Sequence, residues 1–195
     1  MKKSSEELIN ELQAGVRQLL LKAEKLKAEP INLLQLQPAE GHWSVAQILA
    51  HLNSYGRFYL PAIETSMNAA DHPPSEKFHS GWFGNYFTKI MQPGAGGKIP
   101  KKMKSPRNHQ PLLTVNAHEV INEFIIQQQQ LLTLLDACRQ KNLEKTKVPI
   151  SISKMIRLKL GDTFRFLIAH EERHFGQIAR TFKAVQGSMP LFDDQ

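Results

Sequence analysis

Two histidines lie four residues apart near the end of the chain, in the string HEERH at positions 170–174. Residues at this spacing lie one turn apart on the same face of a helix, so the imidazoles of His170 and His174 can reach one metal ion. A metal site needs at least a third ligand. His51 is the candidate, because it lies at the border of the apolar face of its predicted helix, as the other two do on theirs. The three residues therefore predict a histidine metal site inside a helix bundle.

Two other interpretations of these histidines remain open. HEERH also satisfies the H-E-x-x-H pattern of zinc metalloproteases, in which the glutamate is the general base. The following residues, IARTFKAVQG, contain neither His nor Glu, and no strand pattern predicts an edge for a peptide substrate, so we disfavour a protease. The simpler alternative is that each histidine bonds a backbone carbonyl at the border of the core.

Four further residues are candidates for chemistry or for the core. Glu171 lies near the middle of its helix's apolar face, where it acts either as a general base or as a partner within the bundle, in a salt bridge or as an acceptor for a ligand histidine. Tyr55, one turn beyond His51, and Gln127, on another core face, are candidate substrate-binding residues, although Gln127 could instead bond a neighbouring helix. Cys138 resembles a small core residue more than a nucleophile.

Four stretches of helical periodicity must position these residues. They cover about 5–28, a stretch from 44 that carries His51, a stretch from 116, and about 161–186 with Gly187 at its end. Ser44 with Gln47 forms a capping box that sets the register of the second stretch, and Asn116 with Glu119 gives a similar start to the third. The chain is therefore predicted to be all-α, an antiparallel four-helix bundle with one long crossover between the second and third helices.

Two segments between the helices are less regular. Residues 71–115 are predicted to be an irregular insertion that contains a short helix at 81–91, packed through Trp82, Phe83, Phe87 and Ile90. A connection this long is uncommon in a compact domain, so it either crosses the bundle or covers something functional. Residues 143–160 could hold a short extended piece.

Length and composition limit the class of protein. The 195 residues, 41% of them hydrophobic, fit a single domain over 1–195. The single cysteine and the absence of an 18-residue apolar stretch or a signal-like start predict a cytoplasmic protein without a membrane span. The formal net charge of +7 falls to +2 without the five cations of residues 98–107, so the positive charge is concentrated in one loop. The sequence disfavours nucleic-acid binding through this loop, because it lacks interleaved aromatics and a second basic patch.

Two motifs together carry a family resemblance. Trp43-Ser44-x-x-Gln47-x-x-x-His51-Leu52 and His170-x-x-x-His174-x-x-Gln177-Ile178, in this order, resemble the DinB/YfiT-like superfamily. The resemblance implies a four-helix bundle, often a homodimer, with a divalent metal ion such as Zn, Ni or Mn held by His51, His170 and His174. It also implies thiol-dependent transferases and isomerases that use bacillithiol, mycothiol or glutathione as cosubstrate, although many members have no known reaction.

These observations lead to two main hypotheses. The first is a metal-dependent enzyme, similar to thiol S-transferases, that activates a thiol or water against a small electrophile. The second is a non-catalytic metal-binding protein that serves in a stress response or as an interaction module. The surroundings of the metal distinguish them, because an enzyme needs a pocket with polar groups beside an open coordination position.

Overall fold

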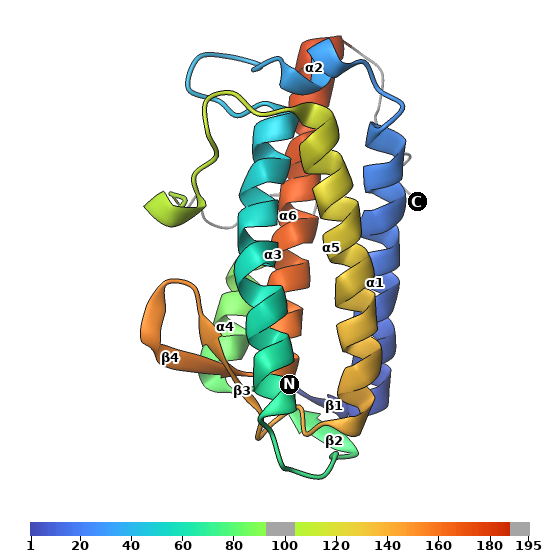
Figure 1. Ribbon diagram of the computed structural model, residues 1–195, viewed down its shortest axis with the longest axis vertical. Helices are drawn as coiled ribbons and strands as arrows, with labels where there is room; N and C mark the ends of the chain where they lie inside the picture. Colours follow the sequence, from blue (N-terminus) through green and yellow to red (C-terminus); the bar gives the residue numbers. More distant parts are fainter. Residues whose placement is uncertain (93–103, 188–195) are drawn as a thin grey trace.

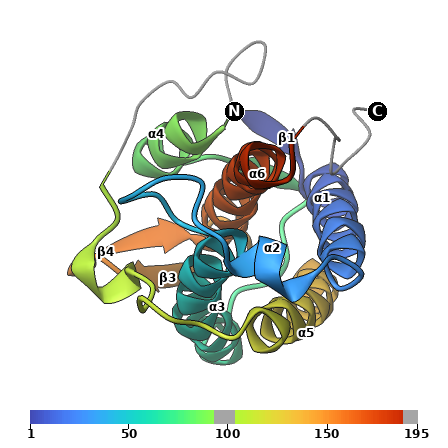
Figure 2. The same cartoon turned by 90° about the horizontal axis from the view of Figure 1, so that it is seen from above.

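Four long helices lie side by side in the computed structural model, which describes residues 1–92 and 104–187 (Figure 1). They are α1 (Ser5–Leu26), α3 (Val45–Asn68), α5 (Ala117–Ala137) and α6 (Leu160–Gln186). Both α1 and α3 pack against α5 and α6, and Figure 2 shows the four helices end-on around a common core. The short helix α2 (Ile31–Gln35) crosses one end of the bundle. The predicted all-α class is confirmed, with only small strand pairs added.

The helix ends follow the local signals in the sequence. The Ser44 hydroxyl accepts from the backbone N–H of Gln47, and the Gln47 side chain accepts from the backbone N–H of Ser44, so the predicted capping box is present. The Asn116 side chain accepts from the backbone at the start of α5, although Glu119 bonds the Asn116 side chain instead of its backbone. Gly187 follows α6 with φ 89°, in the left-handed region that favours glycine.

Two small antiparallel sheets flank the bundle. Strand β3 (Lys147–Ile150) pairs with β4 (Ser153–Lys159), which is the extended piece expected within 143–160. Strand β1 (Lys2–Ser4) pairs with β2 (Lys77–His79) and was not predicted. Each of these two strands has three residues, too few for an alternating pattern to be recognised.

The connection between α3 and α5 is more regular than predicted. It contains β2, the helix α4 (Trp82–Met91) and the 3₁₀ turn η2 (Arg107–His109). The short helix exists and Phe87 packs against the core as predicted, but the packing predicted for Trp82 and Phe83 is wrong, because they are 75% and 54% exposed while Gly84 and Thr88 are buried. A Cβ atom at Gly84 would lie 2.2 Å from Cγ of Asp162, so α4 docks on α6 through a residue without a side chain.

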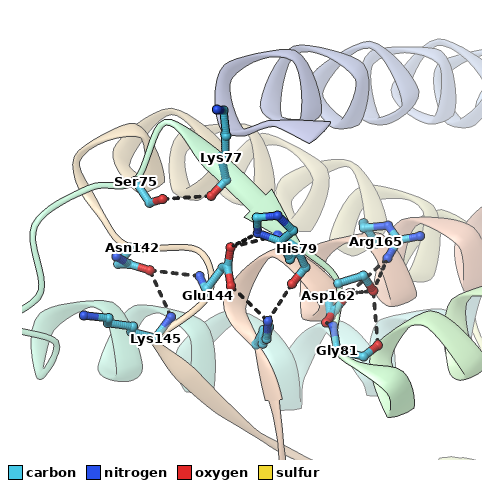
Figure 3. Close-up of polar contacts among 11 residues, drawn as sticks. Ser75, Lys77, His79, Gly81, Asn142, Glu144, Lys145, Asp162 and Arg165 are labelled. Atoms are coloured by element: carbon cyan, nitrogen blue, oxygen red, sulfur yellow. Dashed lines mark hydrogen bonds and ion pairs between the residues drawn. The ribbon is translucent and has the colours of Figure 1, made fainter. Parts of the chain in front are cut away.

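Polar contacts hold α4 and the β3–β4 hairpin at the start of α6 (Figure 3). The buried Asp162 carboxylate accepts from the Ser80 hydroxyl at 2.5 Å, the Gly81 N–H at 2.7 Å and the Arg165 guanidinium at 3.0 Å. Beside it, Glu144 accepts from His79 and Lys159. Although burial opposes the change, these hydrogen bonds lower the pKa of Glu144 to about 2. Ion pairs and hydrogen bonds therefore fix α4 and the β3–β4 hairpin against α6.

Two sequence predictions, the basic segment and the absence of a membrane span, can be compared only with the described part of the chain. Lys98, Lys101 and Lys102 of the basic segment lie outside the described residues, whereas Lys104 and Arg107 lie within them. In the described part of the chain, every helix is too short or too polar to cross a membrane.

Candidate metal centre

The three predicted ligands come together between α3 and α6. One ring nitrogen from each of His51, His170 and His174 lies within 4.8 Å of the other two. The Nε2 atoms of His51 and His170 are 3.4 Å apart. His51 and His170 are buried, and His174 is partly buried. The predicted convergence of the triad is therefore present in the fold, and the cluster is compatible with metal binding.

Hydrogen bonds orient two of the three rings. Nδ1 of His51 donates to the backbone carbonyl of His109 at 2.7 Å, because a carbonyl oxygen can only accept. Nδ1 of His174 bonds the side-chain oxygen of Gln177 at 2.8 Å and acts as the donor. Both bonds place the proton on Nδ1 and leave the Nε2 lone pair of each ring available as a ligand.

Burial keeps the imidazoles neutral. Desolvation lowers the pKa of His51 to about 4 and that of His174 to about 3, in each case against a weaker opposing hydrogen bond. Burial also lowers the pKa of His170 well below its ordinary value, and the two neighbouring histidines add to this shift. Neutral imidazole is the form that binds a metal ion. The donor set therefore fits a divalent ion, with three uncharged nitrogens and, among the described residues, no carboxylate in the cluster.

His109 is a residue of the site that sequence reasoning missed. Its carbonyl orients His51, its ring stacks on Tyr55 with centroids 3.8 Å apart, and its Nδ1 lies 2.9 Å from the Ser54 hydroxyl. A backbone carbonyl leaves no trace in a pattern of side chains, so His109 could not be identified as a partner of His51. The length of the connection was the one available signal, since it indicated a segment that covers something functional.

The two candidate substrate-binding residues lie in different places. Tyr55 lines the cavity beside the triad, with its ring 4.4 Å from that of His170, and burial raises the pKa of its phenol. Gln127 donates to the Asn53 carbonyl at 3.2 Å and to Glu123 at 3.0 Å. Its side chain also fills the space that a Cβ of Gly56 would occupy. Gln127 therefore bonds the neighbouring helix α3, and it is not among the described residues that line the cavity.

Glu171 lies in the core between α5 and α6. Its carboxyl group accepts from the Gln128 amide at 3.1 Å, and the residue is 3% exposed. Burial raises the pKa of Glu171 to about 8, against the hydrogen bond from Gln128, which lowers it. Among the described residues that line the cavity, Glu171 does not occur. Its observed contact is thus a bond between helices to a neutral amide.

A cavity of about 620 Å³ lies beside the triad. His51, Tyr55, His170 and His174 form part of its wall. Further residues of α3 and α6 line it too, together with elements distant in the sequence, namely the residues before α3, the helix α4, the β3–β4 hairpin and the segment around Ser105. The three imidazoles therefore face a space large enough for a small molecule.

The sequence profile of the DinB superfamily matches residues 14–178. The chain belongs to the DinB superfamily. The matched range includes His51, His170 and His174 together with the whole connection between α3 and α5. Neither the comparison with curated proteins nor that with solved structures gave a match. The family predicted from the two sequence motifs is therefore confirmed.

We expect this DinB-superfamily chain to retain metal well below pH 6.5, the ordinary pKa of histidine. Protons compete with metal only when the imidazoles accept them, and burial lowers the pKa of His51 to about 4 and that of His174 to about 3. Zn²⁺ affinity measured against a competing chelator from pH 7.5 to 4 should therefore begin its steep fall below pH 5. A fall that is complete at pH 6 would show that the rings titrate as exposed histidines.

Proposed function

We propose that the chain is a divalent-metal-dependent enzyme that activates a thiol or water for attack on a small electrophile. The observation that carries this proposal is that the triad faces a cavity. In the described part of the chain, no Asp, Glu, Cys or further His completes the cluster as a fourth ligand. A structural metal site would be closed by such a ligand, whereas a catalytic site keeps a position open.

The residues of the site have distinct proposed roles. The bonds to the His109 carbonyl and to Gln177 hold His51 and His174 with Nε2 available as the ligand atom. When bound, a divalent ion would lower the pKa of a thiol or water in the cavity. Tyr55 is a neutral phenol because burial raises its pKa, so it is suited to donate a hydrogen bond to a substrate.

Glu171 is better placed as a positioning residue than as the general base. Its bond to Gln128 joins α6 to α5 at the residue that follows His170 in the sequence. The catalytic role predicted from the sequence would require its carboxyl group to reach the cavity, which is lined by His170 and Arg173 but not by Glu171 in the described residues. We therefore assign general-base function to no protein carboxylate of the described site.

The metal and the thiol follow from the chemistry of the ligands and from the family. An all-imidazole donor set favours Zn²⁺ or Ni²⁺ over Mn²⁺, which prefers carboxylate ligands. A low-molecular-weight thiol is the proposed cosubstrate, because Cys138 is buried and burial raises its pKa to about 12. The reducing cytoplasmic location predicted from the single cysteine suits such a thiol. The homodimer implied by the family stays a prediction.

A reconstitution experiment tests the proposed function. Chelator-treated protein is loaded with Zn²⁺ or Ni²⁺ and mixed with glutathione or bacillithiol and a chromogenic aryl chloride, and separately with a nitrophenyl ester for hydrolysis. We expect a rate above the uncatalysed one that requires the metal and disappears in His51→Ala. Stoichiometric metal without a rate in either assay would favour the non-catalytic metal-binding protein.

A further inference from the structure

The charged residues of the cavity are all of one sign. Among the described residues that line it, the formally charged ones are Lys104, Arg173 and Arg180, and none is Asp or Glu. The described lining of the cavity therefore carries only positive formal charge.

The lining changes character along α6. Phe166, His170, His174 and Arg180 follow one another along the helix and all face the cavity. At 1.5 Å per residue, Phe166 and Arg180 lie about 21 Å apart along the helix axis. The cavity is thus apolar at one end and cationic at the other, with the triad between them.

The apolar end is built from aromatic and aliphatic side chains. The Phe166 ring lies 5.9 Å from the Tyr59 ring and 6.3 Å from the Phe87 ring, measured between centroids. The β3–β4 hairpin adds Ile150 and Leu158 to the same wall. Binding of a hydrocarbon group there would be favourable, because it would remove apolar surface from water.

The cationic end is formed by Arg180, which lies beyond the triad on α6, whereas Arg173 lies at the level of the triad, between His170 and His174 in the sequence. Arg173 and Arg180 are seven residues apart, two turns of the helix, and the Arg173 guanidinium also donates to the Ile90 carbonyl at 3.1 Å. In the described chain, no acidic side chain forms an ion pair with Arg180. Arg180 is therefore the cation at this end that can bind an anionic group.

We propose that the cavity binds an organic anion with an apolar body, its acidic group at Arg180 and its hydrocarbon part between Tyr59, Phe87 and Phe166. The middle of such a molecule lies beside the triad. The role of this ligand as the substrate rests on the proposed function, whereas its binding does not.

Calorimetric titrations with simple amphiphiles test the proposal on the full chain, metal-free and Zn²⁺-loaded. The probes are decanoate, decyl phosphate, decan-1-ol and butanoate. We expect decanoate or decyl phosphate to bind about ten-fold tighter than the alcohol at low ionic strength, and less so at 0.5 M salt. Decanoate should also bind at least about a hundred-fold tighter than butanoate, since each buried methylene contributes about 0.8 kcal/mol. The stronger of the two acidic probes identifies the anionic group.

Variants of Arg180 identify the cationic end. Arg180→Gln should lose about ten-fold in affinity for the anion, measured on metal-free protein so that direct binding to metal does not contribute. Arg180→Lys should retain part of the affinity. Arg157→Gln is the matched control, because Arg157 is exposed on β4 and does not line the cavity. Circular dichroism confirms that each variant is folded.

The outcomes separate this inference from the proposed function. Equal affinity for decanoate and decanol, or an Arg180→Gln variant that binds like the native protein, would overturn the inference even if metal-dependent activity is found. An anion preference that depends on Arg180, in a protein that binds no stoichiometric metal, would support the inference while the proposed function fails.

Discussion

Replacement of His174 by alanine is expected to reduce bound metal from one ion per chain to an undetectable level and to leave the helix content unchanged. Only two imidazoles of the triad would remain, fewer than the three protein ligands of a catalytic zinc site. The fold should survive, because His174 is only partly buried and its hydrogen bond to Gln177 is local. Elemental analysis of protein purified without a metal-affinity tag measures the first quantity, and circular dichroism the second.

A matched histidine variant controls this experiment. His118 is exposed in the first turn of α5, so His118→Ala should keep both the metal and the fold. If His174→Ala keeps its metal, the triad is not the site. If it unfolds, the ion has a structural role, and the milder His51→Gln variant then shows whether metal can be removed from a folded chain.

Replacement of Glu171 by glutamine is expected to stabilise the metal-free protein by about 3 kcal/mol at pH 7. Burial raises the pKa of Glu171 from 4.5 to about 8, so the folded protein holds a proton that the unfolded chain has released. The stability associated with this proton is complete below pH 4.5 and is lost as the pH rises towards 8. Glutamine resembles the protonated acid and keeps an acceptor for Gln128, so it avoids this loss.

The pH dependence is the decisive measurement for Glu171. The difference in free energy of unfolding between variant and native protein, from urea titrations, should be near zero at pH 4.5 and should grow up to pH 8. Glu64 is exposed on α3, so Glu64→Gln should show no such trend. A constant difference would contradict the raised pKa, and a loss of activity by 10²-fold or more in Glu171→Gln would restore the general-base role.

The ligands of the site were predictable because local interactions position them. The Ser44 capping box sets the register of α3 and thereby the face on which His51 lies. The four-residue spacing places His170 and His174 on one face of α6 whatever the rest of the fold does. Periodicity and caps act over a few residues, and those residues are contiguous in the sequence.

The partners of the buried polar residues were decided by the tertiary structure. Periodicity placed Gln127 and Glu171 correctly on buried faces. It carried no information on which helix would lie opposite, and the packing turned Gln127 towards Asn53 and Glu171 towards Gln128. The observed contacts of Gln127 and Glu171 are therefore with neighbouring helices and not with the cavity.

The cavity itself also depends on contacts between distant parts of the chain. Its walls unite α4, the β3–β4 hairpin and the segment of His109 with the face of α6. The docking of α4 relies on Gly84 against Asp162, 78 residues later, whereas Trp82 and Phe83, which were predicted to pack, are exposed. The sequence by itself determined the three candidate ligands and the helices that carry them, since these follow from spacing. Only the tertiary structure decided the shape and charge of the space that they face, because that space forms where segments far apart in the sequence meet.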